Sequence, residues 1–359
     1  MSLELANDHP NAWALFGATG VTGQMVLEQA MQRGHRPLLV GRDPQRLMAL
    51  AAPRGLEFRQ ANLADPESLA VALKGRRALL NVAGPFSETG VPLIRAALSA
   101  GLSYADLNGE APALQRLLDM DGEARRAGLT LVGGAGFGIA ASDGLAAMVS
   151  GALGGADWLR ISVASDSAHD SPAVAESTLA VLAGGGREII DGEVVRRNLG
   201  RRRWRVLGAD GSRQAFASAP LADLVGARHA TGVRQIVAGV PMPASQAAVL
   251  SVIAPVLPAL LKIPTVRRQI LSSSGHSGVA GLRAPVSRVW VEGGRGDARC
   301  TGRLEGGEGY AMAAEIAVRA MEAICGGKAP IGAHTPATAF GPDFIRSVNG
   351  LRINFDVKP

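Results

Sequence analysis

Hydrophobic and polar positions follow one pattern over the first 135 residues of the chain and another beyond them. In the first part, short apolar runs are separated by segments in which apolar positions recur every three or four residues, as on one face of a helix. The short runs predict six strands, at 12–17, 37–40, 56–59, 78–82, 103–107 and 129–132. The segments between them predict five helices, at 22–33, 44–52, 66–73, 90–100 and 111–127. Such alternation is typical of a parallel sheet buried on both faces.

Beyond the glycine-rich stretch 133–138, the order of the predicted elements becomes mixed. Helices are predicted at 142–150, 172–182 and 310–325. Strands are predicted at 158–164, 203–207, 233–240, 286–292 and 298–304. The sequence therefore indicates a doubly wound α/β domain followed by a second, mixed α/β domain.

The most apolar stretch, 245–263, contains one charged residue and two prolines, Pro255 and Pro258. Its 19 residues are just enough to span a membrane, but a proline-broken helix needs protein neighbours that satisfy its freed backbone groups. We therefore interpret it as two short amphipathic helices packed on the domain or on a second subunit. The alternative is a wall or lid for a lipophilic substrate, or a contact with a membrane surface.

Arginine carries the positive charge of the chain. Of 37 basic residues only four are lysines, which leaves 33 arginines and a net charge of +6. Arginine suits bidentate recognition of phosphate and carboxylate groups. Because the arginines are scattered and aromatic residues make up only 4% of the chain, we expect no nucleic-acid partner. An anionic cofactor or small-molecule substrate accounts for the charge.

The densest basic run is 201–205, in which alternation places Arg201, Arg203 and Arg205 on one face of a strand. We interpret it as a strand edge protected by charge. The alternative is a site for a carboxylate, a coenzyme A phosphate or an acidic carrier protein.

Two cysteines, Cys300 and Cys325, are too few for a disulfide scaffold or a thiolate-rich zinc site, and the histidines lack ligand spacing. We therefore predict no metal site. The N-terminus shows no basic region followed by an apolar core, so no signal peptide is expected. These features are typical of a cytoplasmic protein. We also expect a homodimer, formed by sheet pairing or through the apolar stretch.

The segment GATGVTG, residues 17–23, joins the first predicted strand to the first predicted helix. This is the context in which glycines form a dinucleotide-binding turn. Gly17 would allow the tight turn, Gly20 the approach of a pyrophosphate and Gly23 the close packing of helix on sheet. The helix N-terminus would offer N–H groups to the phosphates.

Two further segments follow predicted strands at the same sheet edge. Arg42 stands where an NAD site usually has an acidic residue, so we predict that it pairs with the 2′-phosphate of NADP. A solvated surface arginine is the alternative. Asp43 precedes Pro44 and is predicted to cap the next helix. Ala83 and Gly84, in NVAGPF, would border the nicotinamide ribose.

Several of these segments resemble the saccharopine dehydrogenase-like oxidoreductases. GATGVTG, GRDPQRL and NVAGPFSETGVPLIRAALSAGLSYADLNGE resemble the NADP-binding domain of that family, and GAGFGIAASDGLA resembles the junction after it. GYAMAAEIAVRAMEAI and HTPATAFGPDFI resemble its C-terminal segment. The resemblance covers roughly residues 12–150 and 286–345 and is closest to saccharopine reductase-like proteins and trans-acting enoyl reductases.

The resemblance implies a Rossmann domain over 1–140 and a mixed α/β domain for substrate binding and dimerisation over 141–308. A C-terminal segment over 309–359 would pack back on the Rossmann domain through its helix. The implied activity is NADP(H)-dependent hydride transfer to a C=N or C=C bond of a small or lipophilic substrate. The implied cofactor contacts are Gly17, Thr19, Gly20, Val21, Thr22, Arg42, Ala83 and Gly84.

The residue that donates a proton is open to two interpretations. Tyr104 lies at the fifth predicted strand, at the sheet edge that faces the cofactor, where it could act as an acid. His169 lies in a loop, 166–171, where it could donate a proton near neutral pH or simply be an exposed residue of a capping loop. The alternatives to a catalytic reductase are a non-catalytic NADP-binding regulator or scaffold, and a reductase associated with a lipid surface.

Overall fold

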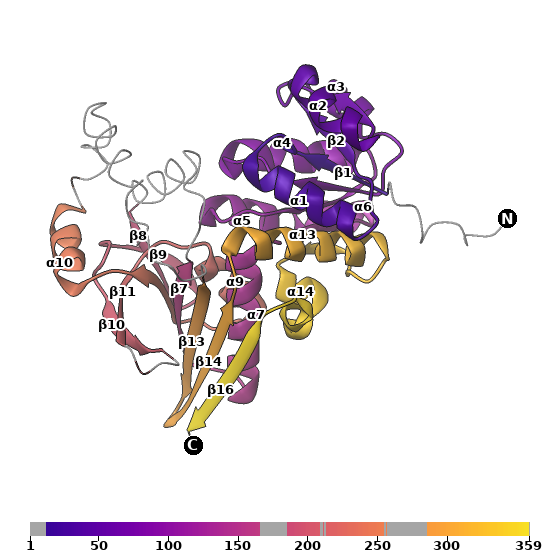
Figure 1. Ribbon diagram of the computed structural model, residues 1–359. Coiled ribbons are helices and arrows are strands. Elements are labelled where there is room, and N and C mark those ends of the chain that lie inside the picture. Colours follow the sequence, from indigo (N-terminus) through magenta and orange to yellow (C-terminus); the bar gives the residue numbers. More distant parts are fainter. Residues whose placement is uncertain are drawn as a thin grey trace. The chain divides into compact units, whose positions relative to one another are not determined.

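The computed structural model describes residues 12–165, 185–208, 211, 213–254, 256 and 286–358 (Figure 1). The chain divides into two compact units, Met1–Ala140 with Tyr310–Phe344, and Ala141–Gly309 with Ile345–Pro359. His169 with its loop, the predicted helix 172–182, and residues 255 and 257–263 of the apolar stretch lie outside the described residues.

The first unit is built on a seven-stranded sheet in the order β15-β6-β5-β4-β1-β2-β3, with every pair parallel. Its strands are β1 (Trp13–Phe16), β2 (Leu38–Gly41), β3 (Phe58–Gln60), β4 (Ala78–Asn81), β5 (Ser103–Asp106), β6 (Thr130–Val132) and β15 (Gly332–His334). The order reverses between β1 and β4. In doubly wound sheets, ligands bind beside the carboxyl ends of the strands at such a reversal.

Two helices of the first unit, α2 (Pro44–Ala51) and α3 (Pro66–Leu73), begin at an aspartate cap that the sequence supplies. The first unit also contains α1 (Val21–Gln32), α4 (Phe86–Ser99), α5 (Ala111–Asp119) and α6 (Asp121–Ala127). The side chains of Asp43 and Asp65 accept hydrogen bonds from the first N–H groups of α2 and α3, and a proline occupies the first turn of each. The predicted capping role of Asp43 is confirmed.

A helix from the end of the chain completes the first unit. In α13 (Gly309–Cys325), Ala317, Val318 and Met321 are fully buried and join the core that contains Val26 and Leu27 of α1. On the same helix, Glu322 accepts hydrogen bonds from Arg33 at 2.7 and 2.8 Å and contacts His35 at 2.9 Å. The predicted return of the C-terminal helix to the Rossmann domain is therefore confirmed.

The second unit contains a nine-stranded mixed sheet, in which seven strands follow the order β10-β11-β12-β7-β13-β14-β16 and the β8–β9 hairpin pairs with β12. The β12–β7 pair is parallel and the other pairs are antiparallel. The strands are β7 (Trp158–Ser165), β8 (Gly186–Ile190), β9 (Glu193–Arg197), β10 (Arg203–Leu207), β11 (Arg213–Ser218), β12 (Ile236–Pro241), β13 (Ser287–Arg295), β14 (Ala298–Gly306) and β16 (Arg352–Lys358).

Side chains alternate between two different faces of this second sheet. One face packs on α7 (Phe137–Ala152), and an added Cβ at Gly293 or Gly302 would lie within 3.0 Å of Val149. On the other face, which we call the polar face, Arg160 pairs in register with Glu292, next to Trp158 and Trp290. Helices α9 (Asp223–Thr231) and α10 (Ala244–Ile253) belong to the same unit.

The end of the chain is divided between the two units. The resemblance implies that 309–359 packs as one segment on the first domain. The structure instead assigns residues after Phe344 to the second unit, because β16 pairs along its length with β14. Only α13, β15 and α14 (Pro336–Phe340), with the residues up to Phe344, belong to the first unit.

Candidate functional site

The loop from Gly17 to Gly23 needs its glycines for close approach. Gly17 has a φ of +95°, and an added Cβ would lie 2.9 Å from Cβ of Ala83. An added Cβ at Gly23 would lie 2.1 Å from the carbonyl oxygen of Gly17. At Gly20 the nearest atom to an added Cβ is 3.5 Å away, so the backbone there can be approached from outside.

The start of α1 is suited to an anion. Gly20 precedes its first turn, and among the described residues no side chain caps that turn and no acidic residue lies in it. The N–H groups of the first turn and the helix dipole are therefore available to a phosphate. Of the other predicted contacts, Val21 and Thr22 lie in this first turn, and Thr19 lies in the loop just before it.

Two arginines flank this loop. Arg42 is exposed directly after β2, and Asp43 beside it accepts from the N–H groups of Gln45 and Arg46 at 3.0 and 3.1 Å. Arg46, also exposed, donates from Nη2 to the carbonyl oxygen of Thr19 at 3.3 Å. Sequence reasoning missed Arg46. The signal that could have found it is its spacing of four residues from Arg42, on the other side of the helix cap.

The loop after β4 is held by side chains. Asn81 Oδ1 accepts from the N–H group of Ala83 at 2.9 Å, and Thr89 Oγ1 donates to the carbonyl oxygen of Ala83 at 2.6 Å. Both polar backbone atoms of Ala83 are thus engaged where Ala83 contacts Gly17. The predicted contacts Ala83 and Gly84 therefore lie next to the glycine loop, at the reversal of strand order.

A buried hydrogen-bond network stands behind this loop. Asn81 Nδ2 donates to Thr89 Oγ1 and to the hydroxyl of Tyr104, each at 3.1 Å. The Tyr104 hydroxyl donates to Asp106 Oδ2 at 3.0 Å. Asp106 Oδ1 accepts from the N–H groups of Asn108 at 3.1 Å and Gly134 at 2.9 Å. The network therefore joins the ends of β4 and β5 to the loop that follows β6.

Burial controls the protonation of this network. Tyr104 is fully buried, and burial together with the neighbouring Asp106 raises its pKa well above its ordinary value. Burial also raises the pKa of Asp106 to about 6, against the lowering effect of the N–H groups of Gly134 and Asn108. These contacts give Tyr104 a positioning role toward Asn81 and Asp106. Its predicted role as a proton donor stays a prediction, which its burial disfavours.

Glu110 connects the loops after β4 and β5. Its carboxylate accepts from the N–H groups of Phe86 and Ser87, at 2.8 and 2.9 Å, and so satisfies the first turn of α4. Its own N–H group donates to Asn108 Oδ1 at 2.7 Å. The sequence pattern alone does not reveal this contact, because it joins two loops that follow different strands.

Three further expectations concern the second proton-donor candidate, a metal site and a membrane-spanning helix. His169 lies outside the described residues, so its catalytic role stays a prediction. Within the described ranges, no group of three or more histidine, cysteine, aspartate or glutamate residues could hold a metal ion. Over the same part of the chain, no helix has the length and apolar character needed to cross a bilayer.

Comparison with known proteins agrees with this geometry. The chain matches the family model described as NAD(P)H-binding over residues 17–104, which include the glycine loop, Arg42 and Tyr104. It is 33% identical over 113 residues to a trans-acting enoyl reductase of Mycobacterium ulcerans, a match that covers 30% of this chain and 27% of that protein.

A second relative is also named as an oxidoreductase. The chain is 29% identical over 140 residues to an Arabidopsis thaliana protein named as a probable mitochondrial saccharopine dehydrogenase-like oxidoreductase. This match covers 34% of the chain and 31% of that protein. The matched segments thus span about a third or less of the length of these curated relatives.

Among solved structures, the fold is similar to that of the apo saccharopine dehydrogenase (L-Glu forming) of Saccharomyces cerevisiae. The TM-score is 0.64 at 13% identity, over 97% of this chain and 99% of that chain. The predicted fold class and the predicted resemblance to saccharopine dehydrogenase-like oxidoreductases are confirmed, and the first unit carries an NAD(P)-binding domain.

Proposed function

We propose that the protein is an NADP(H)-dependent reductase that transfers hydride to a C=N or C=C bond of a small or lipophilic substrate. One observation carries this proposal: the glycine loop after β1 lies at the reversal of strand order, and Arg46 of α2 donates to Thr19 in that loop. It is supported by the names of the relatives that the first domain resembles, an enoyl reductase and a saccharopine dehydrogenase-like oxidoreductase.

The residues present fit a dinucleotide phosphate. The N–H groups at the start of α1 would hold the pyrophosphate, and Gly20 leaves room for it. NADPH, when bound, supplies the hydride. Asn81 and Thr89 hold Ala83 and so fix the segment that would border the nicotinamide.

Arginine and aspartate have separate roles after β2. Asp43 caps α2 through its Oδ1, so we assign this acid a capping role in place of the ribose 2′-OH contact of an NAD site. Arg42 and Arg46 would instead pair with a 2′-phosphate.

Isothermal titration with NADPH and NADH tests the cofactor proposal. We expect NADPH to bind at least about tenfold tighter than NADH, as charge-assisted phosphate contacts would give. Arg42→Ala should remove this preference and leave NADH affinity unchanged. Arg95→Ala, at an exposed position of α4, is the matched control and should bind NADPH like the wild type. Equal affinity of the wild type for both cofactors would contradict the proposal.

We assign the proton transfer to His169, because Tyr104 is buried and its hydroxyl is engaged by Asn81 and Asp106. His169→Asn should keep NADPH affinity and lose turnover. The burial of Tyr104 also favours a second candidate function, a non-catalytic NADP-binding regulator or scaffold. Tight cofactor binding without turnover of enoyl, imine and ketone substrates would support that function, and hydride transfer to any of them would exclude it.

The apolar stretch 245–263 is the proposed contact surface both for a homodimer and for an association with lipid surfaces. On α10, Val249 and Val252 are 61% and 77% exposed, which supports a contact there. We propose that this contact is a second copy of the chain. Val252→Asp should then shift the protein from dimer to monomer in analytical ultracentrifugation. Co-flotation of the wild type with liposomes would favour the lipid surface instead.

A further inference from the structure

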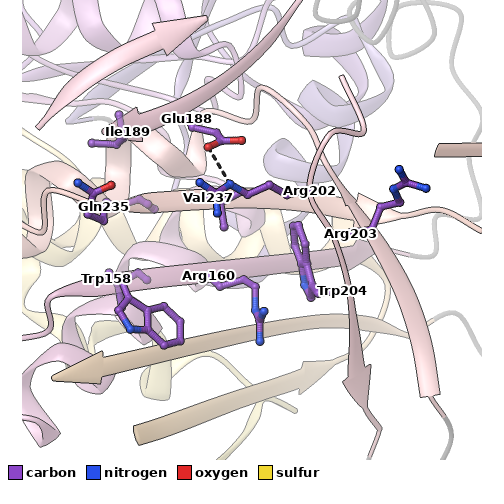
Figure 2. A pocket seen from close by; sticks show the side chains of 11 residues that line it. Trp158, Arg160, Glu188, Ile189, Arg202, Arg203, Trp204, Gln235 and Val237 are labelled. Atoms are coloured by element: carbon purple, nitrogen blue, oxygen red, sulfur yellow. Dashed lines mark hydrogen bonds and ion pairs between the residues drawn. The ribbon is translucent and has the colours of Figure 1, made fainter. Parts of the chain in front are cut away.

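Strand β10, at one end of the second sheet, presents different chemistry on its two faces. On the polar face, Trp204 lines a cavity of about 340 Å³, in which Glu188 pairs with Arg202 at 2.9 Å (Figure 2). Arg203 lies on the opposite face of the strand and points away from this cavity in Figure 2. Arg205 follows two residues later and is exposed on the same face as Arg203. We call this surface the basic face of β10.

The positive charge of the basic face is not balanced by neighbouring acids. Arg213, on the neighbouring strand β11, lies opposite Leu207 and so shares this face with Arg203 and Arg205. Within the described part of the chain, none of these three guanidinium groups makes a hydrogen bond or an ion pair. Residues 196–218 hold seven arginines and one acidic residue, so this segment alone accounts for the chain's net charge of +6. The basic face therefore favours an anionic partner.

The backbone of β10 is open along the edge of the sheet. β10 ends the order of the sheet and pairs with β11 alone among the described strands. The N–H group of Ser218 donates to the carbonyl oxygen of Arg202 at 2.9 Å, so the even-numbered residues of β10 form the hydrogen-bonded pairs with β11. The N–H and C=O groups of Arg203, Arg205 and Leu207 therefore point to the free edge, where they can pair with another strand.

The free edge and the charge together favour an extended acidic segment of a protein. Charge on an edge strand keeps out neutral and basic strands, and it attracts an acidic one. Side chains directly opposite in an antiparallel pair lie on one face, so carboxylates at alternate positions of a partner strand would meet Arg203 and Arg205. A lipid surface or a nucleic acid offers no strand for the open backbone groups. The basic face also has no aromatic side chain on which bases could stack.

We propose that the edge of β10 binds a short extended segment of an acidic partner protein, which adds to the sheet as an antiparallel strand. Two acidic residues of that segment, separated by one residue, pair with Arg205 and Arg203. An apolar residue two positions before the first of them lies beside Leu207, which is 47% exposed. The site uses residues of the second unit alone and does not depend on the proposed cofactor or reaction. It also gives a role to part of the basic run 201–205, which the proposed function leaves unused.

Three fluorescently labelled peptides of seven residues test the proposal on the full chain. The first has valine at its second position, glutamate at its fourth and sixth positions and threonine elsewhere. The second has the same composition with the glutamates at the fourth and fifth positions, which lie on opposite faces of a strand. The third is the first peptide with N-methyl groups on both glutamates, which remove two N–H donors and keep the charge. Fluorescence anisotropy should show saturable binding of the first peptide and an affinity about tenfold or more lower for the other two, since the second loses an ion pair and the third loses strand hydrogen bonds.

Charge reversal locates the binding. Arg203→Glu and Arg205→Glu should each weaken the first peptide about tenfold or more, and the double variant should instead bind a peptide in which lysines replace both glutamates. Arg95→Glu, at an exposed position of α4 in the first unit, changes the net charge equally and is the matched control.

Three outcomes would overturn the proposal. The first peptide gives no saturable signal, it binds no more tightly than the other two, or the double variant Arg203→Glu/Arg205→Glu binds it as tightly as the wild type. Binding of phosphatidylserine vesicles or of an oligothymidylate that depends on Arg203 and Arg205, without binding of the first peptide, would assign the basic face of β10 to that partner instead.

Discussion

The two sheets of this protein bury their side chains differently, and the difference decides where each can bind a ligand. In the first sheet, β1 and β4 are buried at every position, as expected for parallel strands covered on both faces. Binding groups can then lie only in the loops at the strand ends. In the second sheet, Trp158 and Arg160 of β7 are partly exposed on the polar face, and Leu159 between them is buried on the other face. Its polar face can therefore carry a site built from strand side chains.

The chemistry of the two sites differs accordingly. Around Gly17 and Gly20 the binding groups are backbone N–H groups and a helix dipole, and glycines are needed because the chain must approach itself closely. The cavity around Glu188 and Trp204 is lined by side chains instead, and the glycines beside it make room for indole rings.

The largest expected effect follows from the contact inside the glycine loop. Gly23→Ala would place a Cβ 2.1 Å from the backbone oxygen of Gly17, a clash that no side-chain movement relieves. We expect a loss of about 4 kcal/mol in the free energy of unfolding, or failure to fold. Gly90→Ala in α4 is the control: nothing lies within 4 Å of its added Cβ, and it should be neutral or stabilising by up to about 1 kcal/mol. Urea unfolding measures both, and similar values for the two would contradict the role given to Gly23.

Adjacent residues should respond differently in the two sheets. Leu79 and Leu80 of β4 are both fully buried, so Leu79→Ala and Leu80→Ala should each lower the free energy of unfolding by about 3 kcal/mol. On β13, Val289→Ala at a fully buried position should cost about 2 kcal/mol. Within the described part of the chain, its neighbour Arg288 makes one long ion pair, of 3.9 Å with Glu305, so Arg288→Gln should lower the free energy of unfolding by less than about 0.5 kcal/mol. Equal losses in the free energy of unfolding for Arg288→Gln and Val289→Ala would contradict the difference in burial between the two sheets.

The buried acid behind the cofactor loop predicts a pH dependence. Because the pKa of Asp106 is raised from 3.8 to about 6 in the folded state, the folded protein holds this proton more tightly than the unfolded chain. Its contribution to stability is therefore greatest below about pH 4 and falls by about 3 kcal/mol as the pH rises to about 6. Subtracting the unfolding profile of Asp106→Asn from that of the wild type should isolate this fall. A flat difference profile between these pH values would show that the proton is not held.

A smaller effect separates the two roles considered for Tyr104. Tyr104→Phe removes the hydroxyl that joins Asn81 to Asp106, and should cost about 2 kcal/mol in the free energy of unfolding. As a positioning residue, its loss should weaken NADPH binding and lower kcat only modestly. A drop in kcat of about a thousandfold, with NADPH affinity unchanged, would instead identify it as the proton donor.

The sequence predicts most of the first unit because its signals are local. Each strand is a short apolar run, and the Asp-Pro pairs mark the starts of α2 and α3. β15 was missed because it has only three residues and exists through its pairing with β6. Two sequence signals in the second unit could have predicted further strands. They are the Asp191-Gly192 turn between β8 and β9, and the alternation of polar and apolar residues in β16.

The candidate site could also be predicted only where its signals are local. The glycine loop and Arg42 could be found from their positions after predicted strands. The contact of Arg46 with Thr19 depends on how α2 packs beside the loop, and the hydrogen bonds of Glu110 depend on two loops far apart in sequence. The roles of such residues are set by tertiary packing, which the one-dimensional pattern does not contain.

The split composition of the first unit has a consequence for biosynthesis. Its sheet receives its last strand from residues 332–334, and the helix that covers Val26 and Leu27 ends at Cys325. During translation, β6 and this stripe of apolar residues leave the ribosome long before their partners are made. The nascent domain must therefore carry an unpaired strand edge while β7 to β14 of the second sheet are synthesised, and unpaired edges are prone to aggregation.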